Sequence, residues 1–175
     1  MGELARTLVS LSGPNAVHGI IPEALVRYER NHHYTSSPSN GEHGELPVPD
    51  TTLFGRTTVV KDMHTRKQMM VQEVIDGGPG SGFIALSGGY GTLEELLETC
   101  TWNQLGIHNK GICLFNVDGY YDGMLAWISK AIAEGFIKSE NGRIITQATN
   151  AESVIRELKE YKLSGSVLKL SWGNE

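Results

Sequence analysis

Residues 83–97 read FIALSGGYGTLEELL, which joins an apolar run, a glycine-rich turn and a segment with helical spacing. The run Phe83–Leu86 is continuous, as in a parallel strand that is buried on both faces. A helix is expected from about Thr92 to Leu105. A strand that passes through glycines into a helix is the unit from which layered α/β folds are built. The predicted core stripe of the helix comprises Leu93, Leu96, Leu97 and Cys100.

Strands and helices alternate along most of the chain on both sides of this stretch. The alternation predicts βαβ units and a parallel sheet that is flanked by helices. Ligands of such sheets bind at the carboxyl ends of the strands, where the glycine-rich turn falls. We predict strands at 16–21, 56–60, 112–116 and 143–146, and helices at 2–11, 63–75, 121–134 and 151–161, with Asp62 and Asn150 as caps of the second and last helices.

The length and composition limit the domain organisation and the classes of partner. A chain of 175 residues suits one domain, which we expect to span 1–175. Residues 30–50 are crowded with serine, proline and glycine, and we expect them to form a flexible surface insertion. The net charge of −5, with no basic run, argues against nucleic acid or an anionic membrane as partner. A local site can still bind a small anion.

The remaining features of composition indicate a cytoplasmic protein without a metal. No apolar run approaches the roughly 20 residues of a transmembrane helix, and the N-terminus lacks a signal-peptide pattern. Cys100 and Cys113 lie in apolar segments, so we expect free, buried thiols rather than a disulfide. The adjacent His32 and His33 have no acidic or cysteine partner at ligand spacing, so they are not expected to hold a metal.

The turn from Ser87 to Thr92 has the chemistry of a phosphate site. Glycines let the backbone turn sharply and come close to a ligand. The helix that follows offers N–H groups without intrahelical partners and a partial positive charge at its start. Two other interpretations stay open. Thr92 and Glu95 fit a capping box, in which Glu95 only satisfies a backbone N–H, and glycines in such a turn can serve close packing alone.

Two cations, Arg66 and Lys67, lie near the start of the predicted helix that Asp62 caps. The helix dipole disfavours cations there, so the pair suggests contact with an anionic ligand. Chance placement in solvent explains it equally well, and His64 beside the pair is expected to be solvated. On the helix after the glycine turn, Trp102 shares a face with two glutamates away from the core stripe. That placement suggests a subunit interface or a ligand wall.

Together these stretches resemble the Lonely Guy family of cytokinin riboside 5′-monophosphate phosphoribohydrolases, which are often misnamed lysine decarboxylases. The resemblance covers residues 1 to about 160, and the combination of motifs is far more specific than a glycine turn alone. The matching stretches are Asp62-Met63-His64-x-Arg66-Lys67, Gly88-Gly89-Tyr90-Gly91-Thr92-Leu93-Glu94-Glu95, Thr101-Trp102-x-Gln104-Leu105-Gly106-Ile107-His108 and Asn116-Val117-Asp118-Gly119-Tyr120-Tyr121.

The resemblance implies a Rossmann-like fold and a homodimer with sites near the subunit interface. It implies hydrolysis of N6-substituted AMP to a free adenine-type base and ribose 5-phosphate, without a cofactor or a metal. Arg66 and Glu95 match the family's catalytic pair. The positions that match its substrate contacts are Glu29, Arg66, Lys67, Gly88, Gly89, Tyr90, Gly91, Thr92, Leu93, Glu94, Glu95 and Thr101.

The chain departs from the family pattern in three places. Ser87 stands where a proline usually opens the glycine motif. The segment 71–82 is longer than usual, and residues 30–50 look like an insertion. Family members normally begin with about two further strand–helix units, whose last loop ends in a Gly-Leu-Met-Gly type sequence that Met1-Gly2 matches. We therefore expect a Rossmann-like sheet that lacks the family's first strand–helix units.

Cleavage of the glycosidic bond passes through an oxocarbenium-like state. Glu95 is the candidate to orient the water and to stabilise the cation. Arg66 would hold a ribose hydroxyl or the phosphate, and the loop amides, Thr92 and Lys67 would anchor the phosphate. A non-catalytic nucleotide-binding module is the alternative. A pyridoxal phosphate decarboxylase is disfavoured, because it needs a desolvated lysine and Lys67, which is the only lysine near the motifs, lies beside Arg66.

Overall fold

The computed structural model describes residues 2–29, 48–168 and 170, and the chain divides into two compact units. The first unit ends at Met70 and the second begins at Val71, within one helix. A single domain over 1–175 stays a prediction. The predicted insertion at 30–50 lies outside the described residues except for its last three positions.

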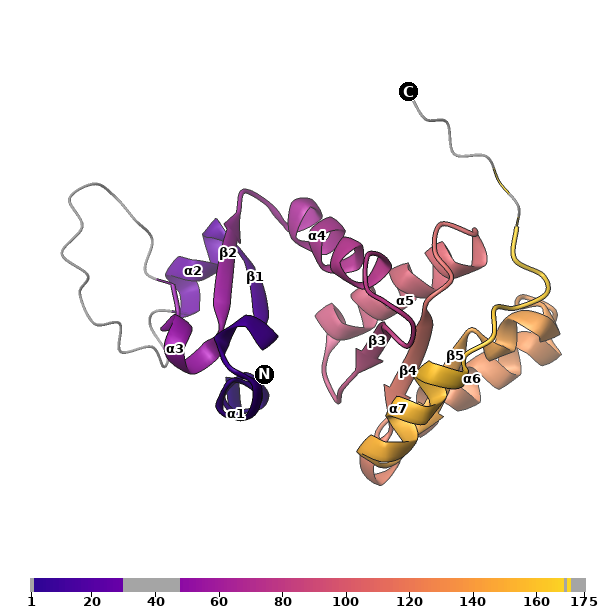
Figure 1. Ribbon diagram of the computed structural model, residues 1–175. Helices are drawn as coiled ribbons and strands as arrows, with labels where there is room; N and C mark the ends of the chain where they lie inside the picture. Colours follow the sequence, from indigo (N-terminus) through magenta and orange to yellow (C-terminus); the bar gives the residue numbers. More distant parts are fainter. Residues whose placement is uncertain (1, 30–47, 169, 171–175) are drawn as a thin grey trace. The chain divides into compact units, whose positions relative to one another are not determined.

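The first unit contains a pair of parallel strands, in which His18 is the register partner of Arg56 and Pro22 that of Val60 (Figure 1). The first strand begins two residues later than predicted, because Pro14–Ala16 form a short 3-10 helix. The second strand has the predicted bounds. The elements are α1 (Gly2–Ser12), β1 (His18–Pro22), α2 (Glu23–Glu29), α3 (Thr51–Phe54), β2 (Arg56–Val60) and α4 (Met63–Ile75), which continues into the second unit.

The helix predicted at the N-terminus is confirmed as α1, which contacts α3. The Arg6 guanidinium lies 5.5 Å from the centroid of the Phe54 ring, a cation–π contact between these two helices. The cap of α4 is also confirmed, since Asp62 Oδ1 accepts the Thr65 N–H at 2.8 Å. That bond is the main reason why the pKa of Asp62 is lowered.

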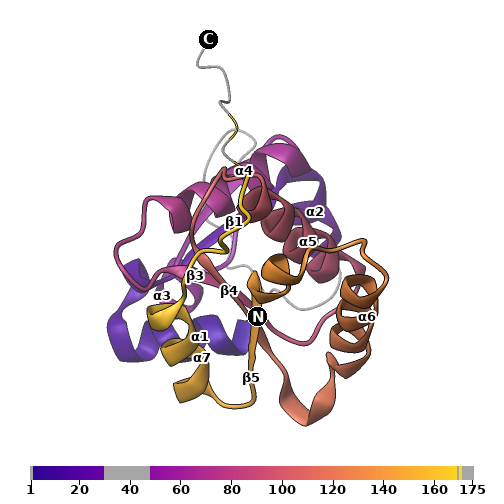
Figure 2. The same ribbon diagram turned by 90° about the vertical axis from the view of Figure 1, so that its right-hand side faces the viewer.

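The second unit contains three parallel strands in the order β3-β4-β5 (Figures 1 and 2). The predicted parallel arrangement is therefore confirmed. The last strand begins two residues later than predicted, because Ser139–Arg143 form a 3-10 helix before it. The elements are β3 (Gly82–Ala85), α5 (Tyr90–Gln104), β4 (Gly111–Phe115), α6 (Asp122–Ala133), β5 (Ile145–Ala148) and α7 (Ala151–Glu160).

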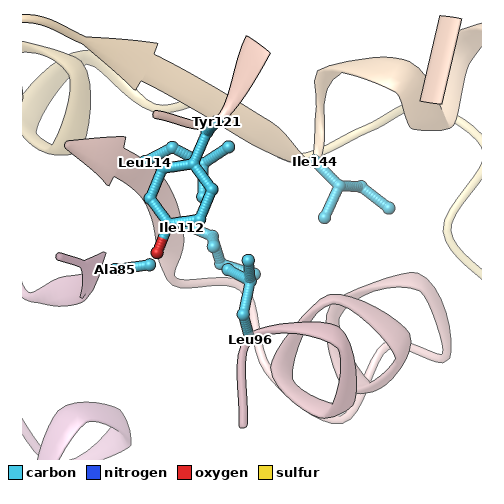
Figure 3. Close-up of a cluster of buried hydrophobic side chains, with 6 residues drawn as sticks. All are labelled: Ala85, Leu96, Ile112, Leu114, Tyr121 and Ile144. Atoms are coloured by element: carbon cyan, nitrogen blue, oxygen red, sulfur yellow. The ribbon is translucent and has the colours of Figure 1, made fainter. Parts of the chain in front are cut away.

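Side chains of β4 alternate between two apolar clusters on opposite faces of this sheet. Ile112 and Leu114 belong to one cluster with Leu96 of α5 (Figure 3). Cys113 belongs to the other, with Val154 of α7. Helices α5 and α7 therefore cover opposite faces of the sheet. This layered arrangement, with parallel strands between helices, confirms the predicted α/β, Rossmann-like class.

Two residues of the opening stretch are less buried than predicted. Ile84 is 44% exposed, because β3 is an edge strand of the described three-stranded sheet. Leu97 is 42% exposed, so its assignment to the core stripe is wrong. The buried face of α5 centres on Leu96 and continues through Thr99 and Asn103, which are both buried. Thr99 and Asn103 can be buried because their side chains form local hydrogen bonds. Thr99 Oγ1 donates to the Leu96 carbonyl, and Asn103 Nδ2 donates to the Lys110 carbonyl.

The prediction of free thiols is confirmed, because neither Cys100 nor Cys113 is in a disulfide. Burial raises the pKa of the Cys100 thiol to about 12, which keeps it protonated and unreactive. In the part of the chain that the structure describes, no helix is long and apolar enough to cross a membrane. The cytoplasmic location stays a prediction.

Candidate functional site

The glycine loop, residues 86–89, connects the carboxyl end of β3 to α5. Gly89 is the N-cap, so α5 begins at Tyr90, two residues before the predicted start. The Leu93 N–H donates to the Gly89 carbonyl at 3.1 Å and closes the first turn. The N–H groups of Tyr90, Gly91 and Thr92 precede that bond and have no acceptor within the helix. Gly89 has no side chain that could accept hydrogen bonds from these N–H groups, so they point out of the start of the helix.

The capping-box interpretation of Thr92 and Glu95 is wrong. Such a box needs the threonine at the N-cap, but Thr92 is the third residue inside α5. Glu95 therefore lies in the second turn, beyond the orphan N–H groups. Its side chain is half-buried, whereas that of Glu94 is exposed. Glu95 therefore does not serve as part of a helix cap.

The glycines of the loop and of the first turn of α5 differ in what requires them. A Cβ at Gly88 would collide with the Thr92 hydroxyl, so a glycine here lets that hydroxyl lie over the loop. A Cβ at Gly89 or Gly91 would meet none of the described residues within 4 Å, and neither glycine has a positive φ. Packing within the chain therefore explains Gly88 but not Gly89 or Gly91.

Two tyrosines from the segment after β4 hold the loop. The Tyr120 hydroxyl donates to the Gly88 carbonyl at 2.7 Å, and the Tyr121 hydroxyl donates to the Leu86 carbonyl. The two rings meet edge to face, with centroids 5.1 Å apart. Tyr121 is buried, which raises the pKa of its phenol, and its hydroxyl points toward Ala85 at the end of β3 (Figure 3).

The segment that carries these tyrosines is fixed by Asn116, which is buried at the end of β4. Its Oδ1 accepts the Tyr121 N–H at 2.7 Å, and its Nδ2 donates to Asp122 Oδ1 at 2.8 Å. Asp118 has a φ of 50°, in the left-handed region that non-glycine residues rarely adopt. This segment is part of the resemblance to the family, but its sequence alone predicted no role for it. An asparagine directly after a buried strand, followed by Asp-Gly, is the signal for such a built turn.

Arg66 and Lys67 lie in the first turns of α4, as predicted, and both are half-buried. Arg66 Nε donates to the Ile20 carbonyl of β1 at 3.1 Å, and Nη1 lies 3.8 Å from the Met63 sulfur. The guanidinium is thus held beside β1, near the carboxyl ends of the paired strands. His64 is exposed, as expected.

The other predicted site residues are distributed over both units. Glu29 is the last residue of α2. Thr101 lies on the exposed side of α5, where its hydroxyl donates to the Leu97 carbonyl at 2.8 Å. The structure brings the loop and the start of α5 together within the second unit, whereas Arg66 belongs to the first. The meeting of Arg66 with Glu95 is therefore part of the proposal below.

The far end of α5 is anchored by His108, which is buried. Its Nε2 lies 2.9 Å from the Thr99 carbonyl, and its Nδ1 accepts the Lys110 N–H at 3.2 Å. These partners require the neutral ring with the proton on Nε2. Burial, with the nearby Lys110 charge, lowers the pKa of His108, so the ring is neutral at pH 7.

This lowered pKa predicts a loss of stability in mild acid. The unfolded chain takes up the proton at a pH of about 6.5 and the folded chain only below that. The contribution of neutral His108 is complete above about pH 6.5 and declines as pH falls toward the folded pKa. We expect His108→Gln, which keeps an Nε2 donor, to lose less stability than the parent between pH 7 and 5. Urea unfolding of both proteins checks this, and parallel pH profiles would contradict it.

The family model described as possible lysine decarboxylase matches residues 1–158. The chain is 52% identical over 163 residues to a cytokinin riboside 5′-monophosphate phosphoribohydrolase of Arabidopsis thaliana, a match that covers 89% of this chain and 67% of that protein. The chain belongs to the Lonely Guy family. The resemblance that its motifs suggested is thereby confirmed.

Two further relatives show how much of the Lonely Guy proteins the chain spans. A bifunctional cytokinin biosynthesis protein of Fusarium pseudograminearum (strain CS3096) is 54% identical over 160 residues, which are 91% of this chain and 31% of that protein. A probable cytokinin riboside 5′-monophosphate phosphoribohydrolase of Oryza sativa subsp. japonica is 43% identical over 164 residues, 94% of this chain and 61% of that protein. The chain thus spans 31% and 61% of the lengths of these two relatives.

Proposed function

We propose that this chain hydrolyses the N-glycosidic bond of N6-substituted adenosine 5′-monophosphates and releases the free base and ribose 5-phosphate. One observation carries the proposal. Gly89 and Gly91 are required neither by their φ angles nor by packing, and they lie where α5 presents its orphan N–H groups. Close approach of a ligand phosphate to this backbone explains both glycines. The Lonely Guy relatives are named for a cytokinin riboside 5′-monophosphate, a nucleotide that carries such a phosphate.

The phosphate would be bound by the start of α5 and the hydroxyl of Thr92. Three N–H groups converge there with the positive end of the helix dipole. The Thr92 hydroxyl, in the first turn of α5, lies over Gly88 of the loop. Tyr90, whose ring is 94% exposed, is available to cover the bound nucleotide. Binding energy from the phosphate would then position the sugar for reaction.

The reacting bond joins C1′ of the ribose to N9 of the base. Glu95, half-buried one turn beyond the phosphate site, would orient a water toward C1′ and stabilise the oxocarbenium-like state. The hydroxyl of the water goes to C1′, and its proton ends on the departing base. Arg66, held by the Ile20 carbonyl, would bind a ribose hydroxyl or the phosphate. Water is the only co-reactant that this reaction needs.

The proposal includes a homodimer with its sites near the subunit interface, in which Arg66 and Glu95 contribute to one site. The half-buried Trp102 and the exposed Leu97 on α5 support an interface along this helix. Sedimentation equilibrium would measure the assembly. A monomer at micromolar concentration would contradict the homodimer.

Product analysis tests the proposed reaction. We expect the purified full chain to convert AMP and isopentenyl-AMP into base and ribose 5-phosphate in equal amounts, as measured by chromatography. Tight binding of either nucleotide without release of base would contradict hydrolysis and identify a binding module. Release of carbon dioxide from lysine after addition of pyridoxal phosphate would instead identify a decarboxylase.

Gly91→Ala should separate stability from ligand binding. Alanine is more favourable than glycine in a helix by about 0.5 to 1 kcal/mol, and a Cβ here has open space. We expect a more stable protein that binds AMP about tenfold more weakly, the equivalent of one hydrogen bond to a charged group. Thermal unfolding and calorimetric titration with AMP measure the two effects.

Gly123→Ala is the matched control, because Gly123 is also the second residue of its helix, α6, and also has open space at its Cβ. It should gain similar stability without loss of AMP affinity. Equal AMP affinity in both variants would show that no ligand approaches Gly91.

A further inference from the structure

The hydrogen bond from Tyr120 fixes the direction of one N–H group in the glycine loop. The carbonyl of Gly88 and the N–H of Gly89 belong to the same peptide group, and the described chain contains no cis peptide. In a trans peptide these two groups point in opposite directions. Because the Gly88 carbonyl accepts the Tyr120 hydroxyl at 2.7 Å, the Gly89 N–H points away from Tyr120. It is thereby presented on the opposite side of the loop.

The peptide between Leu86 and Ser87 has the same orientation. The Leu86 carbonyl accepts the Tyr121 hydroxyl, so the Ser87 N–H also points away from the tyrosines. Two carbonyls, two residues apart along the loop, thus accept hydrogen bonds from hydroxyls on one side. Their partner N–H groups are directed to the other side. An arrangement of this kind presents donors, rather than carbonyl oxygens, to an anion.

The peptide between Gly88 and Gly89 is the one that most needs a restraint. A glycine on each side leaves it without a Cβ to limit rotation. If this peptide flipped, a carbonyl oxygen would face the phosphate in place of an N–H.

Tyr120 is suited to act through its hydroxyl rather than its ring. The ring is 55% exposed, so it contributes little to the core. Its position is set by the edge-to-face contact with the buried Tyr121, whose N–H is bound by Asn116. Loss of the Tyr120 hydroxyl alone therefore leaves the surrounding structure in place.

We propose that Tyr120 is a positioning residue, which holds the Gly88–Gly89 peptide so that the Gly89 N–H faces the 5′-phosphate. The inference rests on the proposed function, because it assumes that the loop binds the phosphate of a nucleotide. Tyr120 itself need not touch the substrate. Its effect is confined to ligands that carry a phosphate.

Tyr120→Phe removes the hydroxyl and keeps the ring. We expect its affinity for AMP to fall about fivefold, the typical range for one hydrogen bond, while its affinity for adenosine and its unfolding temperature stay unchanged. The control is Tyr161→Phe, the same chemical change at a tyrosine that lies against Gly111, at the opposite end of β4 from the loop. It should leave the affinity for AMP unchanged. Calorimetric titration of the full chain with each ligand gives the dissociation constants, with all proteins carrying Glu95→Gln so that AMP is not hydrolysed during the measurement.

The outcomes separate this inference from the function on which it rests. An unchanged AMP affinity in Tyr120→Phe, or an equal loss for AMP and adenosine, would overturn the role of Tyr120 alone. A parent protein that binds AMP no better than adenosine would overturn the phosphate site as well. If the variant does not fold, the proposal is tested on the parent protein, by nuclear magnetic resonance titration with AMP. The Gly89 amide should shift strongly, and a Gly89 amide that stays unchanged while α5 amides shift would refute the proposal.

Discussion

We expect the replacement of Glu95 with glutamine to lower the proposed hydrolysis of AMP by about a hundredfold or more, while the fold and the affinity for AMP are retained. Glutamine has nearly the same shape, but it carries no charge to stabilise the oxocarbenium-like state and is a poor acceptor for the proton of water. The side chain lies beyond the first turn of α5, where the phosphate is proposed to bind, so the affinity contributed by the phosphate should persist. Release of base, measured in single turnovers, gives the rate of the chemical step.

Glu98→Gln is the matched control for this variant. Glu98 lies on the same helix as Glu95, one turn further along, and is also half-buried. It should retain most of the activity, because it lies further from the phosphate turn. Near-normal turnover in Glu95→Gln, or an equal loss in both variants, would refute the role of Glu95.

The second large effect concerns whether Arg66 and Glu95 act in one site. Arg66→Lys keeps a positive charge but loses the Nε that donates to the Ile20 carbonyl and the planar fork that binds oxygens in pairs. We expect it to lower kcat/KM by about a hundredfold. The double variant Arg66→Lys/Glu95→Gln should be no slower than the slower single variant, because residues that act as a unit give non-additive losses.

Arg56→Lys serves as the control for the change of cation, since Arg56 is an exposed residue of β2 in the same unit. It should not affect kcat/KM. Multiplication of the two single losses, to about ten thousandfold in the double variant, would show that Arg66 and Glu95 act independently. That result would contradict a shared site.

The sequence predicted the elements best where a local signal marks their ends. Strand β2 was predicted to the residue, and the caps Asp62 and Asn150 were found because their side chains bond to N–H groups three residues ahead. The start of α5 was placed two residues late, because Tyr90-Gly91 has the composition of a loop. A glycine N-cap has no side chain from which its position could be recognised. The same error produced the wrong capping box.

The sequence predicted only those parts of the candidate site whose residues are close together in the chain. The glycine loop and the two cations near the start of α4 are short local patterns. The hydroxyls of Tyr120 and Tyr121 reach the loop across more than 30 residues, and no periodicity or spacing reveals such a contact. Likewise, the exposure of Ile84 depends on the position of β3 at the edge of the described sheet, which a run of apolar residues does not indicate.

The hydrogen bond between Tyr120 and the glycine loop also has a consequence for the order of folding. A contact between residues 32 positions apart forms only after the intervening chain has been closed into a loop. The glycine loop therefore acquires its final orientation after β4 has joined β3 and the turn at Asn116 has formed. A peptide of residues 83–105 would contain the complete glycine motif and could start a helix, yet it would lack the restraint that orients the loop. The glycine motif is therefore local in the sequence, whereas the orientation that the proposed phosphate site requires depends on the assembled sheet.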